Sequence, residues 1–196
     1  MCGAIFFGVI RLQRQIVVPP PEPTPIPPPV ISADIPPLVV SKDEIELIEI
    51  KPSRSDIAKG VSGTVVVIDK SAFTLEVFSN GQPVKKYPIA VGKNLGDKQR
   101  VGDMRTPEGE FPIVQIQNAS GWTHDFGDGL GNISGAYGPY FIRLGTPGWS
   151  GIGIHGTHAP TSIGTNVTEG CIRLNNDDVL ELRRLVNIGD RVVIRD

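Results

Sequence analysis

The chain is organised around the stretch His155-Gly-Thr-His-Ala-Pro-Thr-Ser-Ile-Gly-Thr-Asn-Val-Thr-Glu-Gly-Cys-Ile-Arg-Leu174. This stretch holds two of the three histidines and one of the two cysteines, and strand-like apolar runs flank it on both sides. A cysteine and a histidine brought together by two strand ends can form a thiolate–imidazolium pair, which is an activated nucleophile. The pattern therefore predicts Cys171 as a nucleophile and His155 as its partner base.

The runs on either side of this stretch predict a mainly β domain. They are rich in β-branched residues or alternate apolar with polar side chains, and turn pairs such as Asn80-Gly81 separate them. The predicted strands are residues 64–69, 73–78, 84–91, 111–117, 140–144, 151–155 and 191–195. We expect them to form a β-sandwich or a small barrel.

One helix is predicted after the cysteine, over residues 177–186. Asn175 or Asn176 can cap its first turn, and Gly189 follows its end. Its apolar residues recur at helical spacing, so this face should pack on the sheet.

The composition favours many turns and argues against a nucleic-acid partner. Of the 196 residues, 23 are glycine and 18 are proline, which suits an all-β domain better than a helical bundle. The formal net charge is −2, and no run of five Lys or Arg supplies the basic stripe that nucleic acid requires. A disulfide between Cys2 and Cys171 is arithmetically possible, but a free and reactive Cys171 is the better interpretation.

The chain divides into three parts by composition. Residues 1–18 form an apolar tail that is too short to cross a bilayer, so it is either a truncated signal or anchor or a disordered tail. Residues 19–60 are predicted to be a proline-rich extended linker, which is a stalk, a ligand for a proline-recognising module or a disordered segment. Within it, residues 41–60 fit a short helix or an edge strand. Residues 61–196 are the predicted folded domain.

Residues 121–149 are dense in glycine and carry aromatic side chains without periodicity. A long irregular segment inside a compact domain is usually functional or disordered. We expect a wall or lid over the site; the alternative is a loose insertion whose aromatic residues pack into the core. His124, in this segment, is interpreted as a surface histidine.

Other residues of the central stretch leave alternatives open. Arg173 lies two residues after Cys171, on the same side of an extended segment, and either binds a substrate carboxylate or forms a structural salt bridge. A zinc site built from His155 and His158 with Cys171 or Glu169 is the chief rival, but no second cysteine completes it. We predict no metal and no cofactor.

The order of two motifs resembles that of the L,D-transpeptidases, the YkuD-like family. The first motif is His155-Gly-Thr157, then a loop containing Gly164, then Thr168-Glu-Gly-Cys-Ile-Arg-Leu174. The second is Val101-Gly-Asp-Met-Arg-Thr-Pro-Glu-Gly-Glu-Phe-Pro112, with Ala90-Val-Gly92 before it. The resemblance covers about residues 63–195.

The resemblance implies a mainly β catalytic domain that acts on peptidoglycan stem peptides outside the cytoplasmic membrane. The cysteine of that family forms an acyl-enzyme on a tetrapeptide stem, releases D-alanine and yields a 3→3 cross-link. Carried over by position, Cys171 is the nucleophile, His155 the general base, and the Gly156 carbonyl orients the imidazole. The amides of Gly170 and Cys171 form the oxyanion hole. The residues expected to contact substrate are Arg173, Thr168, His158, Trp149 and Tyr137.

The resemblance leaves the acyl acceptor open. Water as acceptor would make the protein an L,D-carboxypeptidase or cross-link amidase, and a lipoprotein lysine would make it an anchoring enzyme; a silent wall-binding module is the non-enzymatic alternative. The expected location is the cell envelope, periplasmic or extracytoplasmic, with membrane attachment only through an N-terminal anchor. Glu169 stands where many members have histidine, and a carboxylate there would oppose thiol ionisation unless a cation offsets it.

Overall fold

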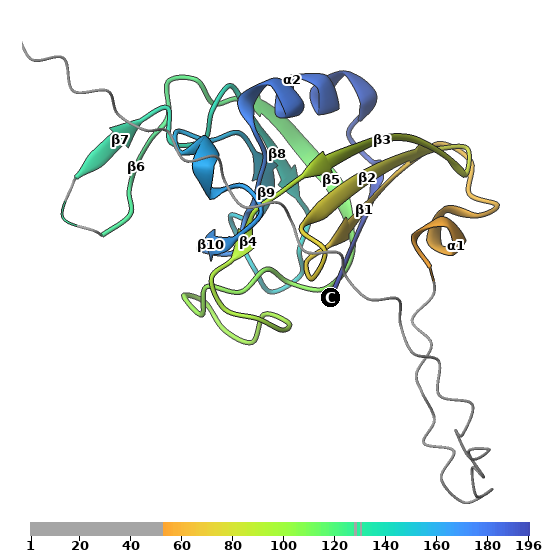
Figure 1. Ribbon diagram of the computed structural model, residues 1–196, viewed down its shortest axis with the longest axis horizontal. Coiled ribbons are helices and arrows are strands. Elements are labelled where there is room, and N and C mark those ends of the chain that lie inside the picture. Colours follow the sequence, from red (N-terminus) through yellow and green to blue (C-terminus); the bar gives the residue numbers. More distant parts are fainter. Residues whose placement is uncertain (1–52, 128, 130) are drawn as a thin grey trace, which may run out of the picture. The chain divides into compact units, whose positions relative to one another are not determined.

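The computed structural model describes residues 53–127, 129 and 131–196, and the ribbon in Figure 1 shows their arrangement. Most of the described chain is strand, turn and loop, with two α-helices and one turn of 3₁₀ helix. The helical elements are α1 Arg54–Ala58, η1 Pro160–Ser162 and α2 Asn176–Leu185. The strands are β1 Thr64–Asp69, β2 Thr74–Ser79, β3 Gln82–Pro88, β4 Val91–Gly92, β5 Gly109–Asn118, β6 Thr123–Asp125, β7 Asn132–Ser134, β8 Tyr140–Leu144, β9 Gly153–His155, β10 Asn166–Thr168, β11 Ile172–Arg173 and β12 Arg191–Arg195.

Eight of these strands form one sheet in the order β11-β9-β8-β5-β12-β1-β2-β3. Neighbouring strands are antiparallel except for the pairs β1–β12 and β11–β9, which are parallel. Two short pairs, β4–β10 and β6–β7, lie outside this sheet. The sheet curls, and it brings β11, the last strand before α2, to the edge where the central sequence stretch lies.

Local sequence explains the hairpins at the other end of the sheet. β1 is Thr-Val-Val-Val-Ile-Asp, whose β-branched residues suit a strand buried on both faces. The turn between β2 and β3 holds Asn80 at φ +49° and Gly81 at φ +78°. Two consecutive positive φ angles are what a tight two-residue hairpin turn requires, and Asn-Gly is the pair that adopts them most readily.

The core lies on both faces of the sheet. The larger cluster contains Leu75, Ile142, Ile154 and Leu182, each 0% exposed, and α2 packs over β8 and β9 on this side. A smaller cluster on the other face includes Ala58 of α1. Complete burial of one such aliphatic side chain contributes roughly 1.5–3 kcal/mol, so these contacts hold the strands in register.

The mainly β fold predicted from sequence is confirmed, as is a helix packed on the sheet after the cysteine. For residues 41–60 a short helix or an edge strand was expected, and α1 lies at the end of this range as a short helix, with a Ser53–Asp56 capping box that stabilises it. One element differs from the expectation. The β6–β7 hairpin lies inside the segment expected to be irregular, because three-residue strands leave little alternation to detect. The tail 1–18 lies outside the described residues, as does most of the linker.

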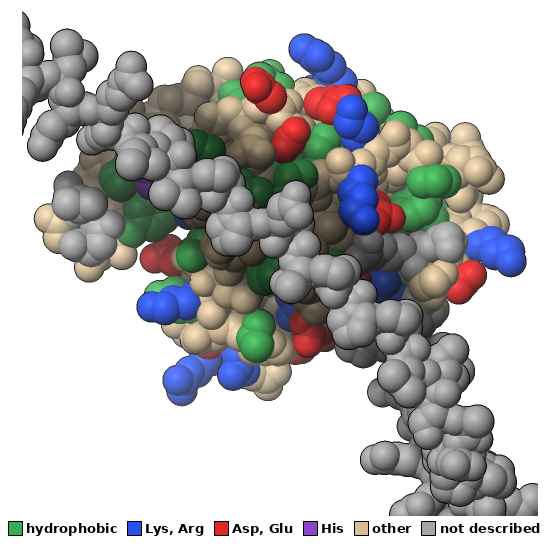
Figure 2. All heavy atoms as spheres, viewed as in Figure 1, with side chains coloured by type: hydrophobic (Ala, Val, Ile, Leu, Met, Phe, Trp, Pro, Cys, Tyr) green, Lys and Arg blue, Asp and Glu red, His purple; other side chains and the backbone are tan. Residues whose placement is uncertain are grey.

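The surface drawn in Figure 2 mixes both signs of charge, with Lys and Arg side chains interspersed among Asp and Glu side chains. None of the helices in the described part of the chain has the length and apolar character that a membrane span needs.

Candidate active site

Three neighbouring strands present the residues of the candidate site on one face of the sheet. In the register, Arg173 of β11 lies opposite His155 of β9, and His155 lies opposite Phe141 of β8. Cys171 immediately precedes β11. Because alternate residues of a strand point to the same face, Cys171 and Arg173 share the face that carries His155 and Phe141.

The imidazole of His155 is buried and held by three neighbours. Its Nδ1 lies 2.6 Å from the carbonyl oxygen of Gly156. Its ring stacks on Phe141, with centroids 5.5 Å apart and planes 6° apart, and meets Tyr137 edge-on at 4.9 Å. A carbonyl can only accept, so Nδ1 carries the proton and Nε2 is left unprotonated as a base.

The sulfur of Cys171 is half-buried and points toward backbone groups. Its thiol donates to the carbonyl of Gly151 over 3.2 Å. Burial raises the pKa of this thiol to about 11, although the Gly153 amide acts in the opposite direction. Burial also lowers the pKa of His155 to about 3, against the effect of the Gly156 carbonyl.

Both shifts favour the neutral thiol and the neutral imidazole, because burial penalises both charges. They therefore act against the thiolate–imidazolium pair that the sequence led us to expect. Such a site suits general-base catalysis, in which the thiol loses its proton as it attacks.

Thr168 and Gly170 shape the loop that carries the cysteine. The Thr168 hydroxyl donates to the carbonyl of Cys171 over 2.6 Å and accepts from the Gly170 amide over 3.2 Å. Gly170 has φ +131°, and a Cβ there would lie 2.8 Å from the carbonyl oxygen of Arg105. Thr168 is 4% exposed, so in this conformation it braces the loop. The Gly170 amide is already engaged, and its oxyanion role stays a prediction.

A hollow of about 320 Å³ opens beside Cys171. Tyr137 and Trp149, both predicted to contact substrate, line it. Glu169 and residues from the segment between β4 and β5, including Lys98 and Met104, line it as well. The volume lies at the lower end of the range for small-ligand sites, which suits a short peptide segment.

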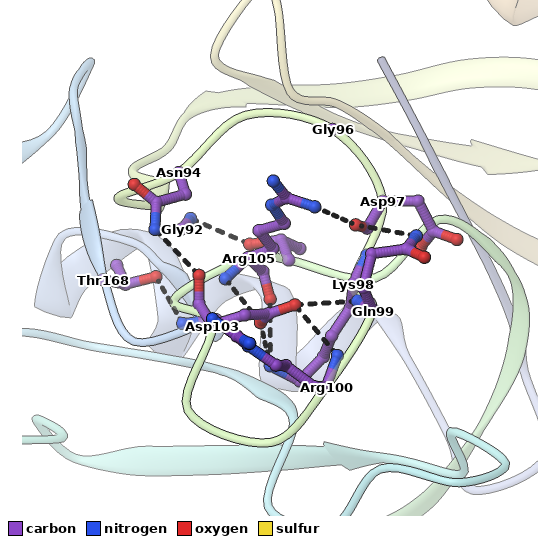
Figure 3. A network of polar contacts seen from close by, with 12 residues as sticks. Gly92, Asn94, Gly96, Asp97, Lys98, Gln99, Arg100, Asp103, Arg105 and Thr168 are labelled. Atoms are coloured by element: carbon purple, nitrogen blue, oxygen red, sulfur yellow. Dashed lines mark hydrogen bonds and ion pairs between the residues drawn. The ribbon is translucent and has the colours of Figure 1, made fainter.

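The wall formed by the segment 93–106 is held by Asp103 (Figure 3). Its carboxylate accepts from Lys98 over 2.7 Å and from the amides of Gln99, Arg100 and Arg105 at 2.7 to 3.1 Å. Burial alone would raise the pKa of Asp103, but these bonds outweigh burial and hold the pKa well below its usual range. Lys98 also lies 5.7 Å from the centroid of the Trp149 ring.

Glu169 contacts His124 of the β6–β7 hairpin. Its carboxylate lies 3.0 Å from Nε2 of His124, and His124 packs edge-on against Tyr137 and Phe126. His124 was interpreted as a surface histidine; it is 28% exposed, and it connects the hairpin to the cysteine loop. The Glu169 charge acts to raise the pKa of Cys171.

Arg173 is 6% exposed and donates to the Ser162 hydroxyl over 3.0 Å. It forms no salt bridge within the described residues, and its Nε has no hydrogen-bond partner there. Its guanidinium lies 5.9 Å from the centroid of the Phe126 ring.

The structure does not bring His158 into the hollow beside Cys171. Its Nδ1 lies 3.5 Å from the Ala136 carbonyl, and it lines a different hollow beside the start of α2. Among the residues that the structure describes, no group of three or more His, Cys, Asp or Glu side chains is placed to hold a metal ion.

A curled sheet that carries a cysteine and a buried histidine on one face of adjacent strands defines a class of β-rich domains suited to acyl transfer. Residues 63–194 match the family model of the L,D-transpeptidase catalytic domain, YkuD. The candidate L,D-transpeptidase YkuD of Bacillus licheniformis is 39% identical over 129 residues, 66% of this chain and 64% of that protein. The Bacillus subtilis YkuD is 38% identical over 129 residues, again 66% of this chain and 64% of that protein. The chain belongs to the L,D-transpeptidase family.

Solved structures show the same fold. An L,D-transpeptidase from Mycobacterium smegmatis matches with a TM-score of 0.53 at 23% identity, over 69% of this chain and 59% of that chain. One from Mycobacterium tuberculosis matches with a TM-score of 0.52 at 22% identity, over 68% and 58%. This chain spans just under two thirds of the length of the Bacillus relatives, and the likeness to the mycobacterial structures is one of fold.

Proposed function

We propose that this protein is a cysteine-dependent peptidoglycan L,D-transpeptidase that forms 3→3 cross-links from tetrapeptide stems. The observation that carries the proposal is the position of Cys171 in a hollow, on the same face of adjacent strands as a buried His155 whose Nδ1 is fixed by the Gly156 carbonyl. Family membership supports the reaction class, and the arrangement of thiol and imidazole supports the mechanism.

The first half-reaction acylates the enzyme. As the sulfur attacks the carbonyl carbon before the terminal D-alanine, Nε2 of His155 takes the thiol proton. The negative charge forms on the carbonyl oxygen, where the Cys171 amide is the expected donor. Collapse breaks the carbon–nitrogen bond, His155 returns its proton to the leaving nitrogen, and D-alanine departs from a thioester.

The second half-reaction transfers the acyl group. The side-chain amine of a second stem attacks the thioester carbonyl, and His155 takes one proton from that amine. The thiolate leaves and recovers the proton, which regenerates the resting pair. Water in place of the amine would give the L,D-carboxypeptidase, an alternative that shares every step but the acceptor.

Peptidoglycan stem peptides are therefore the proposed partners, with an envelope lipoprotein as a further acceptor, and the cell envelope is the proposed location. A periplasmic or extracytoplasmic site would place the enzyme beside this substrate. Arg173 is proposed to act near the substrate, because it is a buried cation that makes no ion pair within the described residues.

The test is product analysis by mass spectrometry on a disaccharide tetrapeptide, with the Cys171→Ala variant as the control. The proposal predicts D-alanine release and a cross-linked dimer in the wild-type reaction, both absent in the variant. Tripeptide monomer without dimer would instead identify a carboxypeptidase. Absence of turnover by the wild-type protein would contradict both enzymatic functions.

A further inference from the structure

Arg143 lies in line with Cys171 across three strands. In the register of β8 and β9, Arg143 is opposite Gly153. On the other side of β9, Ile172 is opposite Ile154, so Cys171 lies beside Gly153 in the adjacent strand. Neighbouring strands are about 4.8 Å apart, which places the Cα atoms of Cys171 and Arg143 roughly 10 Å from each other.

Gly153 is the residue that lies between them in the register. A Cβ on Gly153 would lie 2.3 Å from Cε1 of Phe141, so the ring of Phe141 covers this position. The guanidinium of Arg143 lies 5.0 Å from the centroid of that ring. The space between the sulfur and the guanidinium is therefore floored by backbone and by one aromatic ring.

A second hollow, of about 510 Å³, opens at Arg143. Trp122, Tyr137 and Phe141 supply its aromatic walls. Tyr137 and Gly151 line both this hollow and the one that contains Cys171. The Gly151 carbonyl is the group that accepts from the Cys171 thiol. The two hollows therefore adjoin at Tyr137 and Gly151, and Gly151 is a direct neighbour of the sulfur.

Arg143 differs from the other cations near the site in having its donors available. Lys98 is bound to Asp103, and Arg173 is 6% exposed and donates to Ser162. Arg143 is half-buried, and one of its guanidinium nitrogens lies 3.5 Å from the side-chain oxygen of Gln117. Among the described residues it makes no ion pair with a carboxylate.

We propose that Arg143 binds the free carboxylate of the amino acid that leaves from the donor peptide, and that it thereby selects a substrate ending one residue beyond the scissile bond. This inference rests on the proposed function. One extended residue spans about 3.5 Å, so the carboxylate of a single leaving residue lies within reach of a guanidinium on the strand next but one to the nucleophile. A planar guanidinium matches a carboxylate with two parallel hydrogen bonds.

The charge on the opposite side supports the same orientation. Glu169 lines the hollow beside Cys171 and does not line the hollow at Arg143. A substrate carboxylate is repelled from the Glu169 side and attracted to the Arg143 side. The leaving residue therefore lies toward β8, and the remaining stem lies toward Trp149 and the segment 93–106.

The test compares two tetrapeptides that differ only at the C-terminus, one a free acid and one a carboxamide. Loss of a charged hydrogen-bond pair lowers kcat/KM by about 10- to 100-fold. Arg143→Gln should therefore lower kcat/KM for the free acid by about 10- to 100-fold and for the amide by less than about 2-fold. Arg143→Lys, which keeps the charge without the planar fork, should fall between. Arg184→Gln, an exposed arginine on α2, serves as the matched control and should change neither substrate.

The ratio between the two substrates is the decisive quantity. Arg143 also acts to lower the pKa of Cys171, and loss of that effect would slow both substrates equally without changing the ratio. An unchanged ratio in Arg143→Gln would overturn the inference. Absence of any Cys171-dependent alanine release by the wild-type protein would instead overturn the proposed function.

Peptide binding to the Cys171→Ala protein needs no turnover. It therefore distinguishes a failure of the Arg143 inference from a failure of the proposed function. With Arg143 present, the free acid should bind at least about 10-fold more tightly than the amide, and Arg143→Gln should abolish that difference. Equal dissociation constants for the two peptides with Arg143 present would contradict the inference even if the enzyme is active.

Discussion

Replacement of Thr168 by valine distinguishes a brace of the cysteine loop from a substrate contact. The two side chains have nearly the same shape, so the change removes the hydroxyl and little else. It leaves the Gly170 amide and the Cys171 carbonyl without their partner, at present 3.2 and 2.6 Å from the Thr168 oxygen. An unsatisfied buried group costs about 1–3 kcal/mol, and with one group only half-buried we expect a total loss of about 1–3 kcal/mol in the free energy of unfolding.

The same change should lower kcat more than it alters KM. A displacement of the reacting sulfur by about 1 Å can cost two orders of magnitude, so kcat should fall roughly 10- to 100-fold. Urea unfolding measures the stability, and D-alanine release measures the rate. Thr165→Val is the matched control: that exposed hydroxyl bonds the Ser162 carbonyl, and its loss should cost less than about 0.5 kcal/mol. A Thr168→Val protein with wild-type stability and a raised KM would show that Thr168 contacts substrate and does not brace the cysteine loop.

Three further predictions concern the cysteine loop. Because the pKa of Cys171 is raised to about 11, its alkylation rate should rise about tenfold per pH unit from pH 6 to pH 9; a plateau below pH 8 would show a pre-formed thiolate. Because Glu169 acts to raise that pKa, Glu169→Gln should increase the alkylation rate of Cys171 at pH 8, and a decrease in that rate would contradict the predicted direction. Gly170→Ala should lower stability by about 1–3 kcal/mol, since alanine disfavours φ +131° and would crowd the Arg105 carbonyl; an unchanged unfolding midpoint would count against this strain.

Most of the fold could be predicted because its strands carry their signal locally. The β-branched residues of β1 and the Asn80-Gly81 turn specify neighbouring strands within a few residues of sequence. The helix α2 is long enough for its buried positions to recur visibly. α1 and the β6–β7 hairpin are too short for that, and their positions depend on contacts with distant residues.

The candidate site could be predicted in part. The strand ends indicated Cys171 and His155, and the structure places them on one face of adjacent strands. His158 is near them in sequence, yet it lines another hollow together with Thr157, beside the start of α2. The role of Asp103 depends on loop closure, which spacing alone does not reveal.

Arg143 shows a related limit of sequence reasoning. It lies 28 positions before the cysteine and gave no motif signal; the pairing of β8 with β9 brings it into the row that contains Gly153 and Cys171. The protonation state of the site was also beyond reach, because it follows from burial, which is a property of the folded domain.

The central claim is that Cys171 carries the acyl group between the two stems. Rapid quenching of the 196-residue chain with a tetrapeptide donor, followed by intact-protein mass spectrometry, tests it most directly. The account predicts an adduct equal to the donor mass minus D-alanine, mapped to Cys171 and absent from Cys171→Ala. D-Alanine release that persists in Cys171→Ala would contradict the account.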